Sequence, residues 1–156
     1  MTFDAITMTP VAVVVGGRYE PIDDGWGGVE AEIRLDASRF KPDVFAGLAD
    51  FSHIEVVYVF DRVNEADINY SARHPRERED WPLVGIFAQR ARLRPNRIGV
   101  SVCELLTVEG LVLRVRGLDA IDGTPVLDIK PYMSGFAPRG NVREPDWVGE
   151  LMANYW

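Results

Sequence analysis

The amino-acid sequence predicts an all-β fold, a barrel or a sandwich with one short helix and one C-terminal helix. Apolar and polar residues alternate in several short runs, a pattern typical of strands with one face in water. Glycine and other turn residues separate these runs. No Gly-x-Gly-x-x-Gly sequence opens a helix after a strand, which argues against a Rossmann sheet. At 156 residues we expect one domain, 1–156, with a core over 8–135 and a helical tail over 145–156.

The first half of the chain contains three predicted strands and one helical turn. The second strand alternates most clearly, with Ala31 and Ile33 between Glu30, Glu32 and Arg34. A period of two places such apolar side chains on one face. In chain order the predicted strands are Val11 to Val15, Val29 to Leu35 and Ile54 to Phe60, and the helical turn is Pro42 to Ala49.

Residues 61–82 are polar and without periodicity, and a loop of that length inside a domain is usually functional or disordered. Four strands are predicted after it, and Glu109-Gly110 forms a hairpin turn between the second and the third. The chain from Asp146 to Tyr155 has apolar residues at helical spacing, which predicts an amphipathic helix. The four strands are Val84 to Ala88, Val100 to Val108, Leu111 to Gly117 and Val126 to Ile129.

Composition excludes several classes of protein. The single Cys103 allows no internal disulfide, lies in an apolar run and is interpreted as a buried thiol. His53 and His74 have no metal-site spacing, so we expect no metal. No apolar run is long enough to span a membrane, and the N-terminal residues lack the basic start of a signal peptide. We therefore expect a cytoplasmic protein.

The distribution of charge is uneven. The net charge is −7, which argues against non-specific coating of nucleic acid. Arginine nevertheless concentrates in one stretch, and its guanidinium group suits bidentate binding of phosphate or carboxylate. Because acidic residues are interleaved between 73 and 80, that part is read equally well as a solvated loop. The seven arginines are Arg73, Arg76, Arg78, Arg90, Arg92, Arg94 and Arg97.

Three blocks of sequence resemble the TrmO (TsaA-like) family of S-adenosylmethionine-dependent tRNA methyltransferases. Residues 84–101 read VGIFAQRARLRPNRIGVS, residues 118–132 read LDAIDGTPVLDIKPY, and residues 47–54 read GLADFSHI. The resemblance implies a compact antiparallel β-barrel, a non-Rossmann methyltransferase that pairs as a homodimer with the cofactor near the interface. It also implies methylation of the exocyclic amine of threonylcarbamoyl-adenosine beside the anticodon of tRNA.

The resemblance also assigns cofactor contacts to four short stretches that follow or precede predicted strands. Glycines in two of them permit close approach of the backbone to a ligand. The implied S-adenosylmethionine contacts are Gly16, Gly17, Arg18, Asp61, Arg62, Arg90, Val100, Ala120, Ile121, Asp122 and Gly123.

Two further groups of residues are candidates for the acceptor side. Arg92, Arg94 and Asn96 are expected to contact RNA, because alternate arginines of an extended segment project from one side. Asp122, Lys130 and Tyr132 are expected to shape the catalytic pocket. A rival interpretation makes Asp128 and Lys130 a buried structural pair.

The chain departs from its longer relatives at two places. It has Gln89 to Arg97 where those relatives read TRSPFRPNP, and Asp61 where they carry histidine. These departures concern the acceptor more than the cofactor. The alternatives are therefore an S-adenosylmethionine-binding protein acting on a different RNA or a small molecule, and a non-catalytic sensor.

Overall fold

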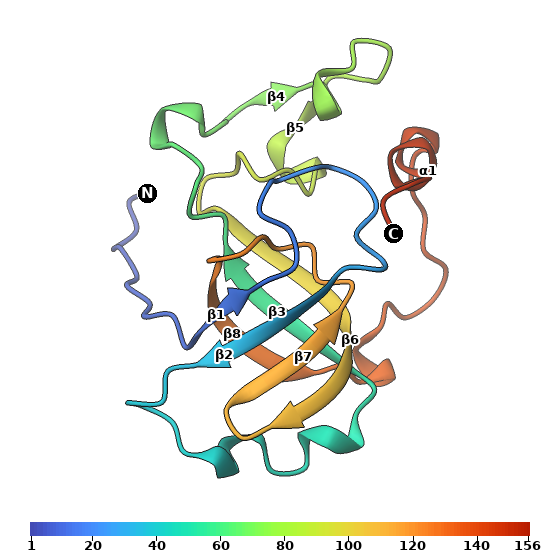
Figure 1. Ribbon diagram of the computed structural model, residues 1–156. Coiled ribbons are helices and arrows are strands. Elements are labelled where there is room, and N and C mark those ends of the chain that lie inside the picture. Colours follow the sequence, from blue (N-terminus) through green and yellow to red (C-terminus); the bar gives the residue numbers. More distant parts are fainter.

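Six strands form a closed antiparallel barrel in the computed structural model, which describes residues 1–156 (Figure 1). The all-β prediction is confirmed, and the barrel is the correct one of the two predicted arrangements. Around the barrel the strands are β1 (Ala12–Val15), β2 (Glu30–Leu35), β7 (Val112–Arg116), β6 (Ile98–Glu109), β3 (His53–Val59) and β8 (Pro125–Pro131), and β8 pairs with β1 to close the ring.

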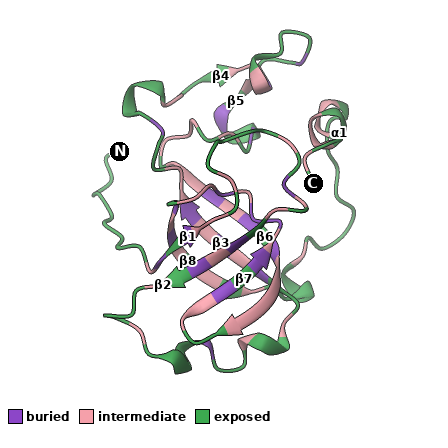
Figure 2. Ribbon diagram, viewed as in Figure 1, coloured by how far each residue is buried: buried purple, intermediate pink, exposed green.

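The core is the inside of the barrel. Alternate residues of each strand point inward, so Ile33 and Leu113 are fully buried while Arg34 and Arg114 between them face water. Cys103 lies in this core, 2% exposed, as the sequence predicts. Figure 2 shows the buried residues concentrated on the strands and the exposed ones in the loops at both ends.

Most predicted strand boundaries agree with the structure to within two residues. The β6–β7 hairpin turns at Gly110, whose φ of 61° lies in the left-handed region that glycine adopts readily. A bulge between Leu105 and Thr107 bends the long strand β6.

The strand predicted over 84–88 is wrong beyond its first two residues. Only β5 (Val84–Gly85) is extended, and it pairs with the equally short β4 (Ala72–Arg73) in a separate two-stranded sheet. The chain then turns into the 3-10 helix η5 (Ile86–Ala88), because turning there buries Ile86, 3% exposed. The apolar run therefore reflects one buried contact rather than a barrel strand.

The remaining helices are short. The predicted turn over 42–49 consists of two 3-10 helices, η1 (Pro42–Phe45) and η2 (Leu48–Asp50). The helix α1 (Asp146–Met152) begins at the predicted residue but ends before Tyr155. Three more 3-10 turns lie in loops: η3 (Glu65–Asp67), η4 (Pro75–Glu77) and η6 (Ser134–Phe136).

Three loops gather at one end of the barrel. They follow β1 (16–29), β3 (60–97) and β7 (117–124), and α1 lies beside the first two (Figure 1). The opposite end carries the β6–β7 turn, η1 and η2. The loop end therefore brings together all four stretches that contain the expected cofactor contacts.

Candidate functional site

The loops after β1 and β7 are tied together at the point where the barrel closes. The Gly16 amide donates to Oδ1 of Asp122 at 2.8 Å, across 106 residues of sequence. The Asp122 amide donates to the carbonyl of Arg18 at 2.7 Å, and the Gly123 amide donates to that of Val14 at 2.8 Å. Four of the expected cofactor residues thus belong to one hydrogen-bonded cluster.

The glycines of this cluster adopt conformations that other residues rarely adopt. Gly16, Gly17 and Gly123 have φ values of 77°, 72° and 84°. A side chain at Gly16 would meet no atom within 4 Å, so its backbone faces open space. A side chain at Gly17 would instead lie 3.2 Å from the Ala31 side chain. Gly16 is therefore a place where a ligand can approach the backbone closely.

Arg62 belongs to the same cluster, but its neighbour Asp61 does not. The Arg62 guanidinium donates to the carbonyls of Asp122 at 2.7 Å and Tyr19 at 3.1 Å, bridging the loops after β7 and β1. The exposed Asp61 side chain makes no hydrogen bond or ion pair. Arg62 thus has a visible role in holding the site, whereas Asp61 is only adjacent to it.

Arg90 and Val100 are also brought together, on the neighbouring part of the loop end. The exposed Arg90 guanidinium donates to the carbonyl of Val100. Its positive charge also acts on Tyr155, where it opposes the rise in pKa that burial causes. Ala120 is buried and Ile121 half-buried, so these two contribute mainly through their backbone.

The arginine-rich stretch divides into two parts with different partners. In the first part every arginine is paired with a carboxylate. Arg76 binds Asp24 through two hydrogen bonds of 2.7 and 3.1 Å, and Arg78 pairs with Asp80. This part matches the solvated-loop interpretation, since its charges are already compensated.

In the second part no arginine has a carboxylate within 4.0 Å. Each guanidinium donates only to a backbone carbonyl, which leaves its positive charge uncompensated. The contacts are Arg90 to Val100, Arg92 to Pro21 at 3.5 Å, Arg94 to Gln89 at 3.0 Å and Arg97 to Val63 at 3.0 Å. Residues 90–97 are thus a cationic surface at the loop end.

The expectation of an extended segment over 90–94 is wrong. This stretch is irregular and leads into a turn in which the Arg97 amide donates to the carbonyl of Arg94 at 3.0 Å. Its backbone contact to the preceding part of the loop is a single bond, in which the Asn69 amide donates to the carbonyl of Leu93 at 2.9 Å. Arg92 and Asn96 are exposed and Arg94 is half-buried. The three side chains share one loop rather than one face of a strand.

The three expected catalytic residues do not meet within one chain. Asp122 lies at the loop end, whereas the Tyr132 amide donates to the carbonyl of His53 at the opposite end. At about 3.3 Å per residue, Lys130 lies about 16 Å along β8 from Pro125. A pocket formed by all three residues of one chain is therefore excluded.

The rival interpretation of a buried Asp128–Lys130 pair is also wrong. The two side chains do form an ion pair, but they are 51% and 57% exposed. Both occupy positions of β8 that face away from the core, alternating with Ile129. An exposed pair of this kind contributes little to stability because water competes for both charges.

Sequence reasoning missed a polar cluster centred on Asp119. Its Oδ1 accepts hydrogen bonds from the hydroxyls of Tyr58, at 2.8 Å, and Ser101, while Oδ2 accepts from Tyr155 at 2.5 Å. No lysine or arginine pairs with this carboxylate. Tyr58 and Ser101 are inward positions on otherwise apolar strands, and that polarity was the available signal.

The cluster changes the acidity of its neighbours. Burial, and then the nearby Asp119 charge, raise the pKa of Tyr58 and Tyr155 well above their ordinary value. The same two causes raise the pKa of Cys103 to about 12, so this thiol is inert. Both tyrosines therefore remain protonated donors to Asp119 at neutral pH.

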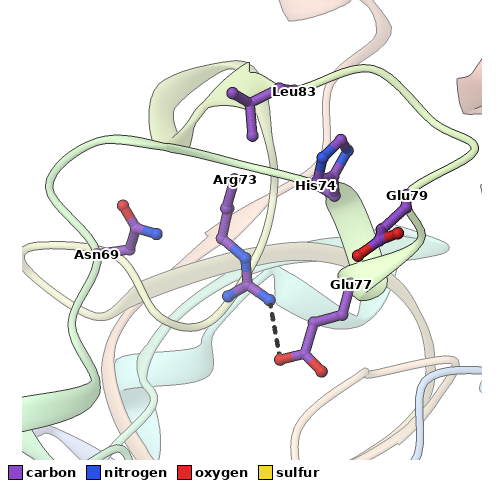
Figure 3. Close-up of a pocket in the computed structure, with 6 residues that line it drawn as sticks. All are labelled: Asn69, Arg73, His74, Glu77, Glu79 and Leu83. Carbon is purple, nitrogen blue, oxygen red and sulfur yellow. Dashed lines mark ion pairs between the residues drawn. The ribbon is translucent and has the colours of Figure 1, made fainter.

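A hollow of about 420 Å³ lies in the loop after β3 and contains none of the expected site residues (Figure 3). Arg73 and Glu77 form an ion pair of 3.7 Å across it. The six lining residues are Asn69, Arg73, His74, Glu77, Glu79 and Leu83. Two carboxylates disfavour a phosphate there, so the hollow is assigned no role.

The structure contains no group of three His, Cys, Asp or Glu side chains that could hold a metal ion. None of its helices combines the length and the apolar character needed to cross a membrane.

Comparison with known proteins gives one matching family. Residues 21–137 match the model of the tRNA-methyltransferase O N-terminal domain. A probable S-adenosyl-L-methionine-binding protein of Pyrococcus abyssi is 43% identical over 141 residues, which cover 88% of this chain and 74% of the relative.

Two further relatives are longer than this chain. The tRNA (adenine(37)-N6)-methyltransferase of Escherichia coli is 39% identical over 106 residues, or 65% of this chain and 45% of the enzyme. A crystal structure of TrmO from Pseudomonas aeruginosa superposes with a TM-score of 0.72 at 26% identity, covering 90% of this chain and 62% of that one. The chain thus spans about half of the first protein and less than two thirds of the second.

The raised pKa of Tyr58 predicts a loss of stability in alkali. The protonated Tyr58 hydroxyl contributes fully to the free energy of unfolding below pH 10. This contribution is lost as pH rises above 10, because the tyrosine ionises there in the unfolded chain and not in the folded one. The free energy of unfolding of Tyr58→Phe should therefore fall less than that of the wild-type protein, by about 1 kcal/mol between pH 10 and 11, where the unfolded tyrosine is half to mostly ionised. Denaturant titrations measure both slopes. The exposed Tyr70→Phe should keep the wild-type slope, and equal slopes for all three proteins would contradict the assignment.

Proposed function

The chain belongs to the tRNA-methyltransferase O N-terminal domain family, and from this membership we propose that it binds S-adenosylmethionine and transfers its methyl group to tRNA. The acceptor is the exocyclic amine of threonylcarbamoyl-adenosine beside the anticodon. Because the proposed substrate is tRNA, we also propose that the protein is located in the cytoplasm. The observation that carries the proposal is the hydrogen-bonded cluster of Gly16, Arg18, Arg62, Asp122 and Gly123 at the loop end of the barrel.

The residues of this cluster fit the chemistry of the cofactor. S-adenosylmethionine carries two positive charges, on sulfur and on its amino group, and one carboxylate. Oδ2 of Asp122 makes no hydrogen bond and can face a cation, whereas Oδ1 is taken by Gly16. The Arg90 guanidinium, without a carboxylate partner, suits the carboxylate. The open backbone of Gly16 permits close approach.

When bound, S-adenosylmethionine supplies an electrophilic methyl group for an in-line displacement. The protein's part is positioning and electrostatic stabilisation. Asp122 is the proposed acceptor of the proton that the amine loses, which is supported by the absence of a hydrogen bond to its Oδ2. Its other oxygen is fixed by the Gly16 amide, which holds the carboxylate plane in one orientation.

The cationic surface over 90–97 supports the RNA part of the proposal. Arg92 and Arg94 have no carboxylate partners, so phosphates meet uncompensated charge there. Arg73, Arg76 and Arg78 are paired with carboxylates and are not assigned to RNA. Asn96, exposed in the same loop, is the third proposed RNA contact.

We also propose that the protein works as a homodimer with the cofactor near the interface. Asp122 lies at one end of the barrel and Lys130 and Tyr132 at the other. A catalytic pocket that contains all three therefore needs two copies of the chain, one supplying each end. We propose that each chain of this dimer folds as a single domain over residues 1–156.

Methyl transfer to total tRNA tests the function directly. The tRNA comes from cells that lack this protein, the methyl donor is labelled, and nucleosides are identified by mass spectrometry. We expect a labelled methyl group on threonylcarbamoyl-adenosine. Binding of S-adenosylmethionine without transfer to any tRNA would contradict the proposed acceptor and favour a small molecule, another RNA or a sensor.

Substitutions at the cationic surface should separate RNA binding from cofactor binding. Arg92→Ala and Arg94→Ala should each weaken tRNA binding and lower the slope of log K against log salt by about one, since each removes one phosphate contact. Calorimetry should give an unchanged Kd for S-adenosylmethionine. Arg78→Ala is the control, because this guanidinium is already paired with Asp80. Equal loss of both affinities would refute the division of roles.

Light scattering on the purified protein tests the dimer. We expect a mass of twice the 17.5 kDa of one chain. A monomer at the concentrations used for catalysis would remove Lys130 and Tyr132 from the pocket that contains Asp122.

A further inference from the structure

The residues that follow α1 are bound to the loop after β1. The Gly25 amide donates to the carbonyl of Asn154 at 2.8 Å, and the Trp26 amide donates to that of Tyr155 at 2.7 Å. Trp156 lies so close to Gly27 that a side chain there would come within 2.7 Å of the Trp156 carbonyl carbon. Segment 154–156 is thus part of the loop end of the barrel.

The Tyr155 side chain reaches from this segment to the interior end of the barrel. Its hydroxyl donates to Oδ2 of Asp119, whose other oxygen is held by Tyr58 and Ser101. Asp119 immediately precedes residues 120–123, the proposed cofactor loop. Without Tyr155, one oxygen of this carboxylate would have no donor.

Segment 154–156 is also connected to the cofactor cluster through the loop after β1. The Arg18 guanidinium donates to the carbonyls of Asp24 and Gly25, both at 2.6 Å, and lies over the Trp26 ring at 4.6 Å. Gly25 and Trp26 are the two residues whose amides bind segment 154–156. The Arg18 carbonyl in turn accepts from the Asp122 amide. A continuous set of contacts therefore joins the segment to Asp122.

The helix α1 holds the segment from the other side. The Trp81 indole donates to Oε2 of Glu150 at 2.9 Å, and the Trp81 and Trp147 rings lie 6.1 Å apart. This packing accounts for Trp147 on the apolar face of α1. The helix lies beside the loop after β3, which contains the arginine-rich stretch (Figure 1).

We propose that Tyr155 is a positioning residue for the S-adenosylmethionine site, acting through Asp119 to fix the loop 120–123. The inference rests on the proposed cofactor function and adds a residue that the family resemblance does not assign. Tyr155 itself touches neither the cofactor nor the acceptor. It orients the backbone that does, so it should influence cofactor affinity and leave RNA affinity unchanged.

The test compares Tyr155→Phe with the wild-type protein by calorimetric titration of S-adenosylmethionine. The variant keeps the ring and the backbone contacts of segment 154–156 and loses only the hydroxyl. We expect Kd to rise about tenfold, as for loss of one hydrogen bond to a charged group. The Kd for tRNA should stay constant. Tyr70→Phe, which removes an exposed hydroxyl with no partner, should change neither.

A double-mutant cycle with Asp119→Asn shows whether Tyr155 acts through Asp119. If it does, the double variant binds S-adenosylmethionine no more weakly than Asp119→Asn alone. Additive losses, or wild-type affinity in Tyr155→Phe, would overturn the inference. Should Asp119→Asn not fold, the titration of Tyr155→Phe alone decides, and wild-type affinity in that variant overturns the inference. Failure of the wild-type protein to bind S-adenosylmethionine would overturn the proposed function, and the inference with it.

Discussion

Closure of the barrel between β1 and β8 is the constraint from which the candidate site follows. The ladder here is short, with only Ala12 opposite Val126 and Val13 opposite Pro125. Beyond it the loops continue the pairing, through the bonds from Val14 to Thr124 and from Gly123 to Val14. Gly16 and Asp122 come next, so the interaction that closes the barrel also builds the cofactor cluster. A change that opened this seam would remove stability and site together.

The loop end combines two kinds of arginine. One kind is structural: Arg76 joins the loops after β3 and β1 through Asp24, and Arg62 joins the loops after β1 and β7. The arginines of the other kind, over 90–97, donate hydrogen bonds to backbone carbonyls, and no carboxylate compensates their positive charge. An acidic protein can therefore present one cationic surface without a basic composition, because its carboxylates pair with arginines elsewhere, such as Arg76 in the loops and Arg116 on the barrel, and not with those over 90–97.

The polar cluster around Asp119 lies where the apolar core of the barrel ends. Tyr58 occupies an inward position of β3, and a side chain at Gly99 of the adjacent strand would overlap its ring. Its hydroxyl thereby reaches the end of the barrel and finds a carboxylate there. Three hydroxyl donors compensate a partly buried charge that has no cationic partner. This arrangement links strands β3 and β6, the loop after β7 and segment 154–156.

The sequence by itself determined the all-β class, the order of the barrel strands along the chain, the buried Cys103 and the hairpin at Gly110. These features depend on the alternation of apolar and polar residues and on the residues that form turns, and both are visible over a few consecutive positions. The resemblance to one family supplied the expected cofactor residues, but not which of them meet. Only the tertiary structure decided that Asp122 joins Gly16 while Lys130 and Tyr132 lie at the other end. It alone divided the arginines by partner and joined Tyr155 to Asp119, because barrel closure brings together residues from distant parts of the chain, and no local pattern records those contacts.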